Sequence, residues 1–129
     1  MRYLKKKKKF SDFFNSFKWA FDGIKECFKR ELNFRFHTLA TVCVLLFSYI
    51  FKIPKRDFIL LLFCIMTVLM AELINTIAEE ICDLIDSNYN KRIKYIKDLS
   101  AGTVLISAMF SVIIGLIIFV PYFIEFFKL

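Results

Sequence analysis

The sequence predicts an all-α integral membrane protein with three transmembrane helices and an N-terminal amphipathic helix at the membrane interface. Hydrophobic residues make up 58% of the 129 positions and include 17 Phe, above the roughly 45–50% apolar content of soluble domains. Three long apolar stretches each approach the length that crosses a bilayer. Their backbone groups must be satisfied within each segment, so helices are expected. The chain is too short for two independent cores, and one domain is expected.

The N-terminal part separates into a basic tail, residues 1–9, and a surface helix, residues 10–30. The run Lys5 to Lys9 is interpreted as an orientation signal and an anchor to anionic lipid. Nucleic acid is not expected as a partner, because no folded reading surface accompanies these lysines. Within residues 10–30 the apolar residues recur at helical spacing, with charged residues off that stripe. This pattern indicates a helix lying in the interface plane.

Three spans are predicted, at about residues 33–52, 57–86 and 95–125, within a single membrane domain of residues 10–129. The first is short, with 16 uncharged residues between Arg35 and Lys52. The second begins as an uncharged run and continues into acidic residues. The third has no charged residue from Leu99 to Ile124 and is the strongest signal. Pro54 favours a tight turn between the first two spans, because proline cannot continue the preceding helix.

The distribution of positive charge predicts the topology. The net charge is +7, and eleven of the 19 Lys and Arg lie in residues 1–35, with four more in residues 91–97. Only four remain for the other side. The positive-inside rule therefore places the N-terminus and the loop before the third span in the cytoplasm, with the C-terminus outside.

The most informative feature is a polar stripe in the second half of the middle span. At about 100° per residue its members fall within an arc of about 80°: Glu72, Asn75, Glu79, Asp83 and Asp86. A carboxylate in or near the bilayer core costs a few kcal/mol and faces a partner, a cavity or a cation. The alternative, an acidic helix end projecting into the cytosol, applies best to the last two residues. Mg²⁺ is the ion that carboxylates and phosphates usually share.

Other polar residues are expected at the same interface: Glu31, the loop residues 88–90, and the pair Lys97 and Asp98. Two carboxylates could hold Mg²⁺, a lysine could hold phosphate, and a third carboxylate could accept a proton from a hydroxyl, which is most of what phosphoryl transfer needs. The pair at 97–98 is equally compatible with an ordinary solvated helix start. The four scattered cysteines and single histidine predict neither disulfides nor a zinc site.

Three motifs make the chain similar to the small prokaryotic diacylglycerol kinase family, which includes undecaprenol kinases. They are Glu31-Leu-Asn-Phe-Arg-Phe-His37, the segment from Ala71 to Glu79 with Asp83 four residues later, and Lys97-Asp98-Leu-Ser-Ala-Gly102. The similarity covers roughly residues 10–125. It implies an ATP-dependent lipid kinase of the bacterial cell membrane and a homotrimer with active sites at protomer contacts.

The resemblance also implies roles for individual residues. Glu72 stands where the family has its general base, and Glu31 and Glu79 stand where it binds Mg²⁺. The implied ATP contacts are Trp19, Glu31, Glu79, Asn88, Tyr89, Asn90, Lys97 and Asp98. Arg35, Asn75 and Asp83 match positions that support the site or the substrate. From its place opposite the apolar stripe, Trp19 is more simply interpreted as an ordinary interfacial tryptophan.

Several functions remain open from the sequence. The expected substrate is a membrane lipid alcohol, with undecaprenol favoured by the form of the first motif and diacylglycerol as the alternative. A small ion or proton transporter would also use intramembrane acids, but the acids cluster at one end and the third span has no polar ladder. A non-catalytic scaffold would need only the small residues of the third span.

Overall fold

The computed structural model describes residues 10–86 and 88–127, so the basic tail 1–9 lies outside the described residues. The described chain forms four helices and no strand: α1 (Phe10–Arg30), α2 (Leu32–Ile50), α3 (Lys55–Ile85) and α4 (Lys91–Phe126). α2, α3 and α4 are long and apolar enough to cross a membrane. The predicted all-α membrane fold is therefore confirmed.

The three long helices differ in length. At about 1.5 Å per residue, the 19 residues of α2 span about 28 Å, close to the thickness of a bilayer's hydrocarbon core. The 31 residues of α3 and the 36 of α4 span about 46 Å and 54 Å. The two longer helices must therefore extend beyond the hydrocarbon region.

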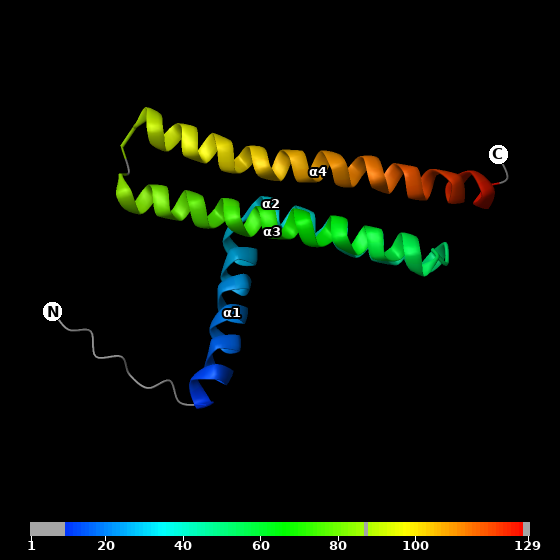
Figure 1. Ribbon diagram of the computed structural model, residues 1–129, viewed down its shortest axis with the longest axis horizontal. Helices are drawn as coiled ribbons and strands as arrows, with labels where there is room; N and C mark the ends of the chain where they lie inside the picture. The colour runs from blue at the N-terminus through cyan, green and yellow to red at the C-terminus, as the bar shows by residue number, and fades with distance from the viewer. Residues whose placement is uncertain (1–9, 87, 128–129) are drawn as a thin grey trace.

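The three long helices form a thin antiparallel bundle (Figure 1). α3 packs most extensively against α4, and α2 packs on α3. The buried residues are few and lie along these contacts: Phe34, Ser48, Leu61, Val68, Ala71, Glu72, Asn75, Cys82 and Ile118. Most large apolar side chains remain exposed in the single chain, as expected where lipid or other subunits cover the helices.

Aromatic residues close the end of the bundle at which α2 turns into α3. Phe51 contacts three phenylalanines of α4, with ring centroids 4.8 Å from Phe123, 5.6 Å from Phe126 and 6.4 Å from Phe119. Edge-to-face ring pairs contribute about 0.5–1.5 kcal/mol beyond the area they bury. This cluster anchors α2 to the far end of α4.

α1 leaves the bundle at a steep angle and is fixed to α3 near its own C-terminus (Figure 1). The Sγ of Cys27 lies 3.8 Å from the Oγ1 of Thr76, and Arg30 forms an ion pair of 3.0 Å with Glu80. Burial raises the pKa of the Cys27 thiol, so the thiol remains protonated and neutral at this contact. The apolar stripe of α1 stays exposed.

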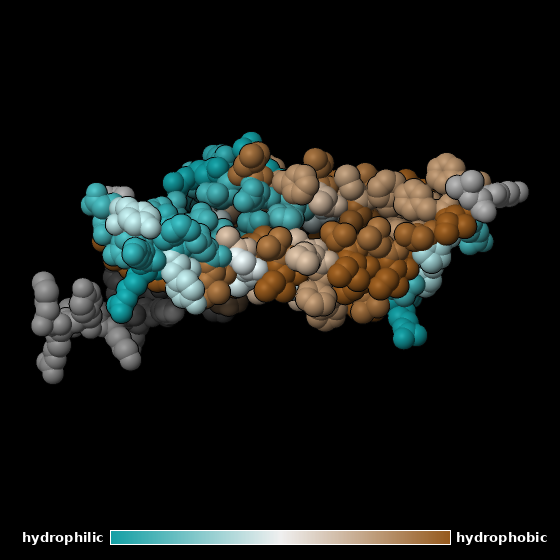
Figure 2. Space-filling model, turned by 90° about the horizontal axis from the view of Figure 1, so that it is seen from above, coloured by the Kyte–Doolittle hydropathy of each residue, from teal (hydrophilic) through white to brown (hydrophobic). Residues whose placement is uncertain are grey.

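The surface of the molecule is divided along its length. Figure 2 shows hydrophilic residues gathered toward the end that carries the α3–α4 connection, and hydrophobic residues covering most of the rest of this face. The acidic second half of α3 and the basic start of α4 both lie at that hydrophilic end. The site residues are therefore concentrated at one end of the bundle.

Candidate active site

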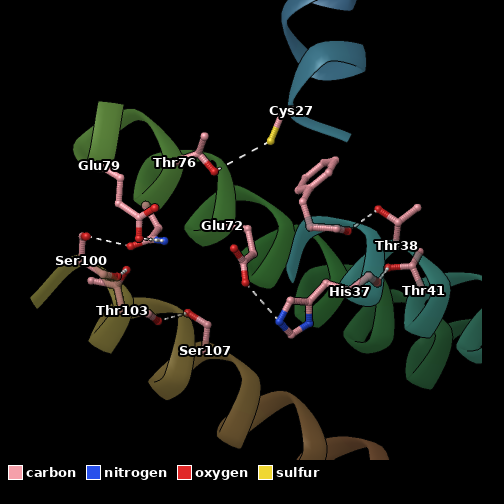
Figure 3. Close-up of polar contacts among 12 residues, drawn as sticks. Cys27, His37, Thr38, Thr41, Glu72, Thr76, Glu79, Ser100, Thr103 and Ser107 are labelled. Atoms are coloured by element: carbon pink, nitrogen blue, oxygen red, sulfur yellow. Dashed lines mark hydrogen bonds and ion pairs between the residues drawn. The ribbon is translucent and has the colours of Figure 1, made fainter. Parts of the chain in front are cut away.

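The centre of the site is Glu72, a carboxylate on α3 with only 2% of its surface exposed. Its Oε1 lies 3.2 Å from the Nε2 of His37 on α2. Figure 3 shows the two side chains pointing toward each other across the gap between the helices. Because α2 and α3 are antiparallel neighbours, two positions 35 residues apart in sequence meet here.

A cavity of about 280 Å³ opens beside this pair. Its polar lining comes from α2 and α3, through Asn33, His37, Glu72 and Asn75. Its apolar lining comes from α4, through Ala101, Val104, Leu105 and Ala108. A cavity with one polar and one apolar wall suits a ligand with a hydroxyl at one end and a hydrocarbon chain beyond it.

Asn75 connects α3 to α4 at the level of this cavity. Its Nδ2 donates to the Oε1 of Glu79 at 3.1 Å, one turn along α3. Its Oδ1 accepts a hydrogen bond of 2.7 Å from the hydroxyl of Ser100 on α4. These two hydrogen bonds connect Glu79 through Asn75 to Ser100 of α4, and Figure 3 shows Glu79 and Ser100 on the facing helices.

A second cavity of about 380 Å³, lined mainly by polar and charged residues, lies beyond this network, where α3 ends and α4 begins. The residues that line it are Asp83, Asp86, Asn88, Tyr89, Asn90, Ile93, Lys94, Lys97 and Asp98. Lys97 pairs with Asp83 at 2.6 Å, and Lys94 pairs with Asp98. Both cations are therefore held in place, and a phosphate would have to compete with these carboxylates for them.

Asparagine and aspartate side chains shape the loop between α3 and α4. The carboxylate of Asp86 accepts a hydrogen bond of 2.9 Å from the backbone N–H of Asn88. Asn90 caps α4, because its side-chain oxygen accepts a 2.9 Å hydrogen bond from the N–H of Arg92. α4 accordingly begins at Lys91, and its first turns extend the helix beyond the span expected from residue 95.

Four of the candidate residues lie outside both cavity linings as the described residues define them: Trp19, Glu31, Arg35 and Glu79. Trp19 is exposed on α1, with 63% of its surface accessible. Arg35 is exposed on α2. Glu31 precedes α2 in an extended conformation, is half-buried and makes no side-chain capping hydrogen bond.

Within residues 10–86 and 88–127, no group of three His, Cys, Asp or Glu side chains is arranged to hold a metal ion. The available donors are carboxylate oxygens of Glu31 and Glu79, which are hard ligands. Mg²⁺ commonly takes one or two protein carboxylates and completes its shell with phosphate oxygens and water. By their chemistry, these two carboxylates suit Mg²⁺.

Sequence reasoning missed two contacts of the site. The sequence places His37 in a motif but does not predict its pairing with Glu72. The sequence assigns no contact to Ser100, whereas in the structure its hydroxyl donates to Asn75. Both residues could have been selected by their position in the sequence, because His37 lies in the motif that begins at Glu31 and Ser100 lies in the motif that begins at Lys97.

Comparison with known proteins identifies the family of the chain. The sequence model of the prokaryotic diacylglycerol kinase family matches residues 18–119. The chain is 37% identical to the undecaprenol kinase of Bacillus subtilis (strain 168) over 109 residues, covering 84% of this chain and 89% of that protein. It is 32% identical to the diacylglycerol kinase of Synechocystis sp. (strain PCC 6803) over 107 residues, covering 82% of this chain and 61% of that protein.

A third relative, the diacylglycerol kinase of Haemophilus influenzae (strain Rd), is 29% identical over 94 residues, covering 72% of this chain and 79% of that protein. The fold and the matches together define an integral-membrane lipid kinase. The chain belongs to the prokaryotic diacylglycerol kinase family.

Proposed function

We propose that this protein transfers the γ-phosphate of ATP to the hydroxyl of a membrane lipid, with undecaprenol as its preferred substrate. The observation that carries the proposal is the cavity beside Glu72, in which a buried carboxylate faces an apolar wall of α4. The greater similarity to an undecaprenol kinase than to either diacylglycerol kinase supports the choice of lipid. Diacylglycerol is the alternative substrate.

Glu72 acts as the general base in this proposal. The lipid hydroxyl enters the cavity with its chain along the residues of α4, and its proton passes to the carboxylate as the oxygen attacks the γ-phosphate. Burial of Glu72 supports the role, since a carboxylate screened from bulk water accepts a proton from a bound alcohol more readily than a hydrated one does. Asn75 and Arg35 support the site and the substrate.

Glu31 and Glu79 would hold Mg²⁺, which when bound would neutralise charge on the phosphates of ATP. The hydrogen bond from Asn75 supports this role for Glu79, because it fixes one carboxylate oxygen and leaves the other available. Glu31 is suited to the same role by its partial burial and by the lack of a capping bond to its side chain.

The nucleotide would occupy the second cavity. Lys97 would bind phosphate, with Asp98 and the loop residues Asn88, Tyr89 and Asn90 around the rest of the nucleotide. The polar lining of this cavity supports the assignment, and so does its position at Asp83, one helical turn along α3 from Glu79. Asp83 would hold Lys97 in position. Trp19 would offer a flat ring to the base from α1, its exposure leaving the ring accessible.

The ATP-binding end would face the cytoplasm, with the N-terminus inside and the C-terminus outside the bacterial cell membrane. The assembly would be a homotrimer with active sites at protomer contacts. The small number of buried residues and the many exposed apolar side chains of the single chain support an assembly within the membrane. Light scattering of the protein in detergent would measure the number of subunits.

The function can be tested directly with the purified protein in detergent micelles. We expect Mg²⁺-dependent transfer of radiolabelled phosphate from ATP to undecaprenol. The matched control is the same lipid with its hydroxyl blocked as a methyl ether, which should receive none. If the folded protein transfers phosphate to neither undecaprenol nor diacylglycerol, the proposal is refuted and the transporter alternative is favoured.

A further inference from the structure

His37 contacts Glu72, but the proposed phosphoryl transfer gives His37 no role. His37 is the only histidine of the chain, and its ring meets the most deeply buried carboxylate of the described residues at 3.2 Å. The side chain of His37 is 19% exposed and that of Glu72 is 3% exposed. Both line the cavity assigned to the lipid hydroxyl.

We propose that His37 is a positioning residue, which donates its Nε2–H to Glu72 and fixes the orientation of that carboxylate in the lipid cavity. The inference rests on the proposed role of Glu72 as the base. It assigns His37 no contact with the reacting atoms.

The neighbours of His37 on α2 support a specific role for this side chain. The hydroxyl of Thr38 donates to the carbonyl of Phe34 at 2.7 Å, and that of Thr41 donates to the carbonyl of His37 at 2.9 Å. Both hydroxyls therefore turn back onto their own helix, whereas the ring of His37 reaches across to α3 (Figure 3). A polar contact between helices restricts rotation of both side chains.

The low exposure of the pair increases the effect of a hydrogen bond between His37 and Glu72. A hydrogen bond in a poorly hydrated setting is worth more than in water, and a buried carboxylate that loses its donor keeps the full cost of its desolvation. Without His37, Glu72 would be free to rotate toward other donors. A misplaced base lowers the rate of the chemical step more than it weakens substrate binding.

Two variants of His37 test this inference by kinetics. His37→Leu removes the donor, and we expect kcat to fall by about ten- to hundredfold, the effect of losing one hydrogen bond to a charged group. The KM values for ATP and lipid should change less than about threefold. His37→Gln places an amide N–H near the position of Nε2 and should restore most of the lost kcat. Thr38→Val on the same turn is the control and should behave like wild type.

A spectroscopic measurement examines the contact without relying on turnover. With a purification tag free of histidine, the imidazole ¹⁵N signals of the protein come from His37 alone. We expect a protonated Nε2 with the downfield proton shift of a hydrogen bond to a carboxylate. In Glu72→Gln that proton signal should move upfield or exchange too fast to be seen.

The outcomes separate this inference from the proposed function. If Glu72→Gln retains wild-type turnover, the base assignment fails and the positioning role of His37 fails with it. If Glu72→Gln is inactive but folded His37→Leu keeps wild-type kcat, only the inference about His37 is overturned. A rise in lipid KM alone would also overturn it, by making His37 a binding residue. Should His37→Leu not fold, the kcat of His37→Gln and the ¹⁵N signals decide.

Discussion

The Nζ of Lys97 on α4 lies 2.6 Å from the Oδ1 of Asp83 on α3, across the turn that joins the two helices. Side-chain exposures of 33% and 60% mean that the pair is solvated and contributes little to stability. Its importance is positional, because it places an ammonium group at the wall of the polar cavity. Replacing Lys97 should therefore affect the nucleotide far more than the fold.

Lys97→Met is expected to raise the KM for ATP at least about tenfold, since one charge-assisted contact to phosphate is lost. Asp83→Asn should raise it less, because the lysine remains but is less well placed. Steady-state kinetics at saturating lipid measure both effects. Lys91→Met, at an exposed position outside both cavities, is the matched control. Equal KM values for Lys97→Met and the control would remove Lys97 from the nucleotide site.

Glu72→Gln is expected to lower kcat by at least about a hundredfold, the usual contribution of a positioned base. Glutamine has nearly the same shape, so the bundle should remain folded and ATP should still bind. Turnover is measured with undecaprenol in micelles and ATP affinity by calorimetry. A variant that turns over like wild type would show that another group accepts the proton.

Glu79→Gln and Glu31→Gln are expected to weaken Mg²⁺ and ATP binding together, because the metal would connect these carboxylates to the phosphates. Glutamine is chosen at position 79 because its oxygen can still accept the hydrogen bond from Asn75. Calorimetric titration with ATP, with and without Mg²⁺, measures the loss. Glu80→Gln is the control, since Glu80 is exposed and pairs with Arg30 instead. Normal binding of Mg-ATP by either variant would exclude that residue as a ligand.

Membrane topology can be tested without any assumption about the reaction. In a cysteine-free variant, a single Cys at Lys55 should react with an impermeant thiol reagent added outside intact cells, and one at Lys91 should not. The cysteine is placed at Lys91 and not at the neighbouring Asn90, because replacing Asn90 would remove the cap of α4. The reverse labelling pattern would place the polar cavity on the side without ATP, and the kinase orientation would be wrong.

The protein is predicted to prefer undecaprenol but also to phosphorylate diacylglycerol. An apolar cavity wall distinguishes hydrocarbon chains weakly, because each buried methylene contributes only about 0.8 kcal/mol. We therefore expect a higher kcat/KM for undecaprenol than for diacylglycerol at equal mole fraction, with measurable activity on both. A reproducible preference for diacylglycerol would reverse the assignment and leave the kinase chemistry intact.

Hydrophobic patterning was sufficient to predict the class of fold. A run such as Leu99 to Ile124 has no stable alternative to a membrane helix, so the all-α class and the three long helices follow from local composition. The membership of the family was equally accessible, because its motifs are contiguous in sequence. The roles assigned to individual residues remain predictions for the experiments above.

The sequence by itself determined that Glu72, Asn75 and Glu79 share one face of a helix, because a helical period relates residues on the same segment. It did not determine which residues of other helices meet that face. The pairing of Glu72 with His37, of Asn75 with Ser100 and of Cys27 with Thr76 depends on how the helices pack. Rotation and register of neighbouring helices arise from the sum of many weak side-chain contacts, which no short motif encodes.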